Sequence, residues 1–286
     1  MVALTALASA GCYALALVLA QIGLRQQSPL AGALISLPVS ALAMAAVAAL
    51  RLDLSGYDGR ALATFLGCGT LFPVSVTLLS FQANRLLGPN LAGALGNATP
   101  IFAVAFGMVI LGDRLSVEQA AGLAIVLGGI ALLSLRGRLE TGRAPVLALG
   151  IPLAGAAIRG VVQPVIKIGL ALWPEPLAAT AIGYGASATV ILLVGVAAGR
   201  GRLRTVERRA VPLFAAVGLL NGASVLLLYS ALAMGRVSVV APLVAIYPLF
   251  TLAFSRVFLR GEPLGPRLVA GIAATVLGVA LLLATS

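Results

Sequence analysis

The chain contains no histidine and only two cysteines, Cys12 and Cys68. Histidine is the commonest metal ligand and the usual general base near neutral pH. Both cysteines fall inside apolar segments, where they suggest neither a disulfide framework nor a metal site. The sequence therefore predicts no metal, no cofactor and no catalytic site, and a membrane-embedded enzyme is disfavoured.

Charged residues are scarce as well, while apolar residues dominate. Only 9% of the 286 residues are charged and 61% are hydrophobic, and the mean hydropathy is +1.12. Soluble domains carry about 25% charged residues. The composition therefore predicts an integral membrane protein whose surroundings are the lipid bilayer.

The few charges are mostly of one sign, because 19 Lys and Arg stand against 8 Asp and Glu, for a formal net charge of +11. A basic excess can indicate nucleic acid binding. Here most arginines lie between apolar runs, where arginine holds loops in the cytoplasm. We therefore expect no nucleic acid partner. The arginines are concentrated in alternate loops, which places both termini outside the cytoplasm.

Long apolar runs, by contrast, fill the chain. A helix needs about 20 residues to cross a bilayer, and the runs are continuous rather than alternating, which argues against membrane strands. The sequence predicts an all-α integral membrane protein with ten transmembrane helices. They are expected near residues 2–24, 30–50, 61–83, 89–111, 119–135, 145–170, 177–198, 210–232, 238–259 and 267–284.

The sequence from Pro100 to Leu133 is repeated, with substitutions, from Pro248 to Leu282. The recurring residues keep their order and spacing, apart from one inserted residue. In the first copy they are Pro100, Phe102, Ala105, Phe106, Val109, Leu111, Gly112, Leu115, Gly122 and Gly129, and in the second Pro248, Phe250, Ala253, Phe254, Val257, Leu259, Gly261, Leu264, Gly271 and Gly278. A duplication inside so apolar a chain is typical of transporters built from two homologous halves.

The duplication divides the chain into a first five-helix repeat at residues 1–138 and a second at 139–286. Five is an odd number, so the second copy enters the membrane from the opposite side. The predicted architecture is therefore two inverted five-helix repeats. A monomeric transporter is compatible with this organisation.

These residues resemble the drug/metabolite transporter superfamily, specifically its ten-helix EamA-type members. Their halves typically end with a proline in the fourth helix, a Gly-Glu turn and a glycine-containing fifth helix. Here the turns read Gly112-Asp113 and Gly261-Glu262, with Asp113 in place of the usual glutamate. The resemblance covers essentially the whole chain. It implies a secondary transporter of the bacterial inner membrane, often an amino-acid or metabolite exporter, with a cavity between the halves.

The most unusual constellation is the series Arg159, Gln163 and Lys167 in the sixth run. A spacing of four residues places them on one helical face. A charge at mid-membrane costs roughly 2.5–3.5 kcal/mol, so it normally faces a wet cavity or a partner. For Lys167, snorkelling to the interface is an equally good interpretation.

The corresponding positions in the first run are Tyr13, Leu17 and Gln21, so the stripe is charged in one half and neutral in the other. If the two helices face each other, one wall of the cavity is positive. Arginine can hold a carboxylate with two parallel hydrogen bonds. The difference between the copies therefore favours a carboxylate-bearing substrate.

Helix breakers recur at corresponding places, and we expect hinges or helix breaks at Pro38, Pro73, Pro100 and Pro248. Interrupted helices in paired repeats indicate a binding site or hinge. Polar residues near these breaks complete the predicted cavity; they are Asn97, Asn221, Tyr229 and Tyr247. The two Gly-acid turns are expected to be structural, since glycine permits a tight turn between helices.

We therefore predict a secondary transporter that exports amino acids or related small carboxylates by alternating access. The alternatives are an exchanger of phosphorylated metabolites or nucleotide sugars, and a broad-specificity drug exporter. Small four-helix relatives that pump cationic drugs use a glutamate within the membrane. All eight acids of this chain fall in expected loops or at helix ends, which disfavours that chemistry.

Overall fold

The computed structural model describes residues 1–96, 98–114, 116–140, 146–197 and 207–259, and positions 270, 271, 273, 274, 277, 278 and 281. Within these residues the chain is helical and contains no strand. The elements follow in chain order as α1 (Val2–Leu24), α2 (Pro29–Arg51), α3 (Gly59–Leu71), α4 (Val74–Gly96), α5 (Thr99–Leu111), α6 (Val117–Glu140), α7 (Val146–Leu172), α8 (Pro176–Ala197), η1 (Arg208–Ala210), α10 (Val211–Met234), α11 (Val237–Val244) and α12 (Tyr247–Leu259).

Seven helical stretches of the described residues are long and apolar enough to cross a membrane, and two shorter apolar helices accompany them. The predicted all-helical membrane fold is therefore confirmed in the part of the chain that the structure describes. The count of ten spans stays a prediction, since most of the last expected span lies outside that part.

Several helices begin at side chains that satisfy the free backbone amides of the first turn. Ser28 accepts from the amide of Ala31 at 3.2 Å before α2, and Asp58 accepts from the amide of Arg60 at 2.6 Å before α3. At α6, Ser116 and Gln119 bond reciprocally at 3.2 and 3.3 Å, a capping box. These local contacts set where each helix starts.

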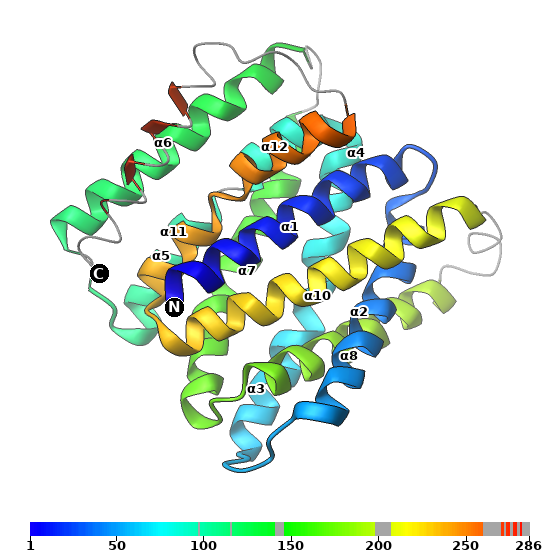
Figure 1. Ribbon diagram of the computed structural model, residues 1–286, viewed down its shortest axis with the longest axis vertical. Helices are drawn as coiled ribbons and strands as arrows, with labels where there is room; N and C mark the ends of the chain where they lie inside the picture. Colours follow the sequence, from blue (N-terminus) through cyan, green and yellow to red (C-terminus); the bar gives the residue numbers. More distant parts are fainter. Residues whose placement is uncertain are drawn as a thin grey trace.

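Helices from the two ends of the chain lie side by side. In Figure 1, α1 runs along α10, while α4 and α7 pass behind them and pack against each other. Further contacts join α5 to α7, α2 to α10 and α1 to α12. The helices before residue 140 therefore bury much of their surface against helices after residue 146, and the central contacts lie between these two sets.

One expected membrane run, 61–83, is divided at Phe72-Pro73 into α3 and α4. The break leaves backbone groups that water cannot reach in a membrane. Ser187 of α8 satisfies two of them, because its hydroxyl donates to the Gly69 carbonyl at 2.6 Å and accepts from the Val74 amide at 3.1 Å. A side chain from the second half of the chain thus stabilises the helix break in the first half.

The other predicted breaks have different outcomes. Pro100 lies in the first turn of α5 and Pro248 in that of α12, so both follow helix boundaries. The predicted break at Pro38 is wrong, because α2 continues through it. Near this proline, Ser40 donates to the carbonyls of Ser36 at 2.9 Å and Gly218 at 2.7 Å. These contacts tie this part of α2 to α10, and the helix stays continuous through the proline.

Glycines allow the closest helix contacts. At Gly160 of α7 an added Cβ would collide with Phe102 and with the backbone nitrogen of Ala103 on α5. Gly278 lies equally close to Gly122 and Val126 of α6, so the duplicated fifth-helix glycines meet. Small residues let membrane helices approach in this way.

Candidate substrate pocket

Arg159 lies in the apolar helix α7, opposite α1. Its Nη2 donates to the Tyr13 hydroxyl at 2.7 Å, and its Cζ lies 4.7 Å from the centroid of the same ring. The guanidinium is therefore held by an aromatic side chain from α1. Among the described residues no carboxylate lies within 4.0 Å of it, so its positive charge has no counter-ion there.

A second tyrosine completes the surroundings of Arg159. The Tyr247 ring, at the start of α12, meets the Tyr13 ring edge to face, with centroids 4.9 Å apart and an interplanar angle of 84°. Tyr247 is only 4% exposed. Aromatic pairs prefer this geometry, so the two rings form a rigid wall beside the guanidinium.

The larger of two adjoining pockets lies between α1, α4 and α10. About 60 Å³ of it is open to the centres of water molecules, which is room for several waters. Apolar side chains such as Phe72, Val76 and Leu228 line much of it, and Tyr13 and Arg159 form one side. We call it the first pocket.

The smaller pocket, called the second pocket, lies between α4 and α7. About 20 Å³ of it is open to water centres. It shares Tyr13, Leu17, Ser80 and Arg159 with the first pocket. The Tyr13–Arg159 pair therefore lies where the two spaces adjoin.

These pockets bring together four of the predicted cavity residues. Arg159 and Tyr13 line both pockets, Asn221 lines the first, and Tyr247 lines the second. The residues come from α7, α1, α10 and α12, so the fold joins both ends of the chain at one site. Asn97, also predicted here, lies outside the described residues.

Other predicted cavity residues line neither pocket. Tyr229 is 3% exposed and belongs to the main apolar core. Gln163 is also 3% exposed, and its Oε1, like that of Gln21, has no hydrogen-bond partner among the described residues. An α-helix turns about 100° per residue, so a step of four residues drifts by roughly 40°. The stripe that begins at Arg159 therefore rotates away from the pocket.

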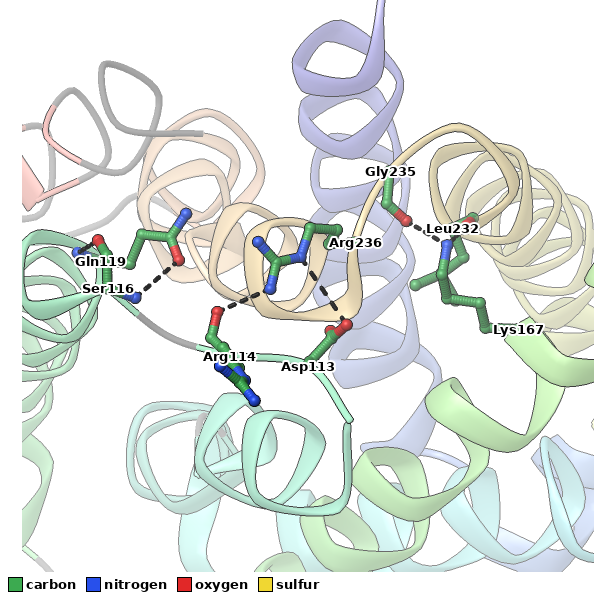
Figure 2. A network of polar contacts seen from close by, with 8 residues as sticks. All are labelled: Asp113, Arg114, Ser116, Gln119, Lys167, Leu232, Gly235 and Arg236. Carbon is green, nitrogen blue, oxygen red and sulfur yellow. Dashed lines mark hydrogen bonds and ion pairs between the residues drawn. The ribbon is translucent and has the colours of Figure 1, made fainter. Parts of the chain in front are cut away.

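After two such steps Lys167 lies elsewhere. Its Nζ donates to the carbonyls of Leu232 at 2.8 Å and Gly235 at 2.6 Å, at the end of α10. Figure 2 shows this contact beside Arg236. A cation at a helix C-terminus satisfies free carbonyls and the helix dipole. Lys167 thus closes α10 and lines neither pocket.

The Gly112-Asp113 turn joins α5 to this same region (Figure 2). Gly112 has a φ of 67°, the left-handed conformation that favours glycine. Asp113 Oδ1 lies 3.8 Å from Arg236 Nε, and Arg236 Nη2 donates to the Arg114 carbonyl at 2.7 Å. The turn thus contacts the loop before α11, and its structural role stays a prediction. Gly261 and Glu262, of the second turn, lie outside the described residues.

Asn84 and Tyr184 are among the pocket residues that sequence reasoning missed. Asn84 follows Ser80 by four residues in α4, and this spacing on one helical face was a usable signal. Tyr184 lies in the apolar α8, with Thr180 four residues before it and Ser187 three residues after it, so helical spacing was a weak signal there as well. In the described part of the chain, no three His, Cys, Asp or Glu residues gather as metal ligands would.

The EamA-like transporter family matches the chain over residues 1–135 and 146–284. The chain belongs to the EamA-like transporter family. This EamA-like protein is therefore a multi-pass membrane protein of a transporter family rather than a member of an enzyme family.

The EamA-like protein is also similar to a solved structure described as "Crystal structure of protein". The sequence identity is 19% and the TM-score is 0.73, over 98% of this chain and 94% of that one. At this identity the likeness shows the fold alone. No curated protein matches the chain.

Proposed function

We propose that this EamA-like protein is a secondary transporter that exports amino acids or related small carboxylate-bearing metabolites. The two inverted five-helix halves rock against each other, so that the pockets around Arg159 open to either side in turn. One observation carries the proposal: a half-buried guanidinium lines a central cavity and has no acidic partner among the described residues.

The charge of Arg159 favours an anionic group in the substrate. A guanidinium has five N–H donors and no acceptor, and the Tyr13 hydroxyl takes one donor of Nη2. A charged group within a membrane costs roughly 2.5–3.5 kcal/mol unless it is wet or paired. A substrate carboxylate supplies both a counter-charge and hydrogen-bond acceptors, which offsets this cost during transport.

The pockets favour this substrate class over the alternatives. A phosphorylated metabolite or nucleotide sugar carries more negative charge, whereas Arg159 is the one cation among the described residues that line the pockets. A cationic drug would be repelled by that arginine, and none of the described residues that line the pockets is an acid that could attract it. A single carboxylate matches a single guanidinium.

The proposal is tested by counterflow in proteoliposomes loaded with a mixture of unlabelled L-amino acids, with ¹⁴C-labelled amino acids outside. We expect the wild-type protein to accumulate label. Arg159→Gln should raise the concentration for half-maximal uptake about 10- to 100-fold, because a hydrogen bond to a charged group contributes about 1.5–3 kcal/mol.

The matched control is Arg60→Gln, which removes an exposed arginine at the start of α3. Its uptake should equal that of the wild-type protein. Arg159→Lys keeps the charge and should recover part of the uptake, since lysine cannot form the bidentate pair. Unchanged uptake in Arg159→Gln would show that the substrate does not bind at this arginine.

A further inference from the structure

The second pocket contains a buried amide group that nothing in the described protein satisfies. Asn84 of α4 is 5% exposed and lines this pocket. Its Nδ2 has no hydrogen-bond partner among the described residues. Buried polar groups in folded proteins are nearly always bonded, so an unbonded one calls for a physical explanation.

The surroundings of Asn84 indicate which kind of group is missing. Its amide nitrogen and the Arg159 guanidinium are both donors that accept no hydrogen bond. The same pocket is otherwise lined largely by small or apolar residues, such as Ala83, Ala156 and Pro152, and by no acid. Two obligate donors in a space without a carboxylate are complementary to an oxyanion.

The sizes of the pockets agree with this assignment. The second pocket leaves about 20 Å³ for the centres of water-sized groups, enough for one or two oxygen atoms at about 10–15 Å³ each. The first pocket leaves about 60 Å³ and has a largely apolar lining. A small polar head therefore fits one side of the Tyr13–Arg159 pair, and an apolar tail fits the other.

We propose that the second pocket is the carboxylate subsite of the transporter, in which Asn84 and Arg159 together hold the anionic head while the first pocket takes an apolar tail. This proposal rests on the proposed function, since it assumes that Arg159 binds the carboxylate. It adds Asn84 as a specificity-determining residue and predicts monocarboxylates with a compact apolar tail as the substrate class.

The test is ligand-induced thermal stabilisation of the purified protein, with isocaproate and its uncharged amide, isocaproamide, as probes. A ligand that binds the folded state raises Tm. We expect isocaproate to raise the Tm of the wild-type protein and isocaproamide to raise it less. Asn84→Leu should weaken isocaproate binding about 10-fold or more, because a hydrogen bond to a charged group is lost.

Two further variants separate a binding role from a structural one. Without ligand, Asn84→Leu should unfold at the same Tm as the wild-type protein or at a higher one, because it removes an unsatisfied buried donor. Asn84→Asp keeps the shape but places a negative charge beside Arg159, so it should abolish the response to isocaproate and keep that to isocaproamide. The matched control, Gln26→Leu, changes an exposed side chain just after α1 and should keep the wild-type preference for the acid.

The outcomes distinguish this proposal from the proposed function. If Arg159→Gln loses the response to isocaproate while Asn84→Leu keeps it, the role of Asn84 is refuted and that of Arg159 stands. If Arg159→Gln also keeps it, both proposals fail. A wild-type protein that responds equally to acid and amide, or to neither, overturns the subsite proposal, whereas the proposed function is decided by the amino-acid counterflow. A lower Tm of ligand-free Asn84→Leu assigns Asn84 a structural role instead.

Discussion

At the scale of residues, two cations on one helix contact different parts of the protein. Arg159 and Lys167 are separated by eight residues of α7 and start from the same sequence pattern. Arg159 meets a tyrosine hydroxyl and the pockets, whereas Lys167 meets the carbonyls at the end of α10. The difference follows from helical drift, which turns the second cation away from the first by roughly 80°.

Lys167→Met is expected to destabilise the protein without weakening substrate binding. The substitution leaves the Leu232 and Gly235 carbonyls without their ammonium partner. Hydrogen bonds to charged groups contribute about 1.5–3 kcal/mol each, so Tm should fall clearly. The Tm of purified protein and the concentration for half-maximal uptake are the two measurements.

The matched control for this prediction is Arg85→Met, which removes an exposed cation of α4 and should leave Tm unchanged. A large increase in the half-maximal concentration for Lys167→Met, at unchanged Tm, would instead place this lysine in the substrate path.

At the scale of elements, close helix contacts depend on single glycines. Gly160 lets α7 touch α5 through Phe102 and the backbone of Ala103. This contact holds the helix that carries Arg159 against a helix from the first half of the chain. Gly185, by contrast, lies within α8 with nothing near the place of a Cβ. Replacing Gly160 by a larger residue should therefore cost more stability than replacing Gly185.

Gly160→Ala should lower stability by about 1–3 kcal/mol, the usual cost of overpacking a core. The added methyl group collides with backbone, which cannot rotate out of the way. Gly185→Ala is the matched control and should be neutral or slightly stabilising, because alanine is the better helix former. The measurement is the Tm of both variants. Equal Tm values would mean that α7 and α5 are not packed this tightly.

At the scale of the whole molecule, a polar network joins turns from distant parts of the chain. The turn after α5 meets the loop before α11 through Asp113 and Arg236 (Figure 2). The Arg236 side chain is 49% exposed and that of Asp113 13%. Solvent therefore screens much of the attraction, and the ion pair can separate at low cost.

A double-mutant cycle with Asp113→Asn and Arg236→Gln should give a coupling energy of only about 0.2–1 kcal/mol, as for other exposed ion pairs. The cycle is measured from the stability of the two single variants and the double variant. A coupling energy of several kcal/mol would show instead that the ion pair contributes strongly to stability.

Hydropathy and the duplication together determined much of this protein. The apolar runs predicted an all-helical membrane protein, the matched residues around Pro100 and Pro248 predicted the family, and Arg159 was singled out as the centre of the site. These features are readable because membrane length and helical period act locally along the chain. The break expected at Pro38 is absent, because α2 continues through this proline and membrane helices tolerate proline where their neighbours satisfy the freed backbone groups.

Only the tertiary structure decided which side chains share a space. Tyr13 and Arg159 are 146 positions apart, and nothing local to either one specifies that both line the same two pockets. The unsatisfied amide of Asn84 and the contact of Lys167 with α10 are likewise visible only in the folded chain. The physical reason is that contact between helices depends on their rotation and packing, which are properties of the whole assembly rather than of any one segment.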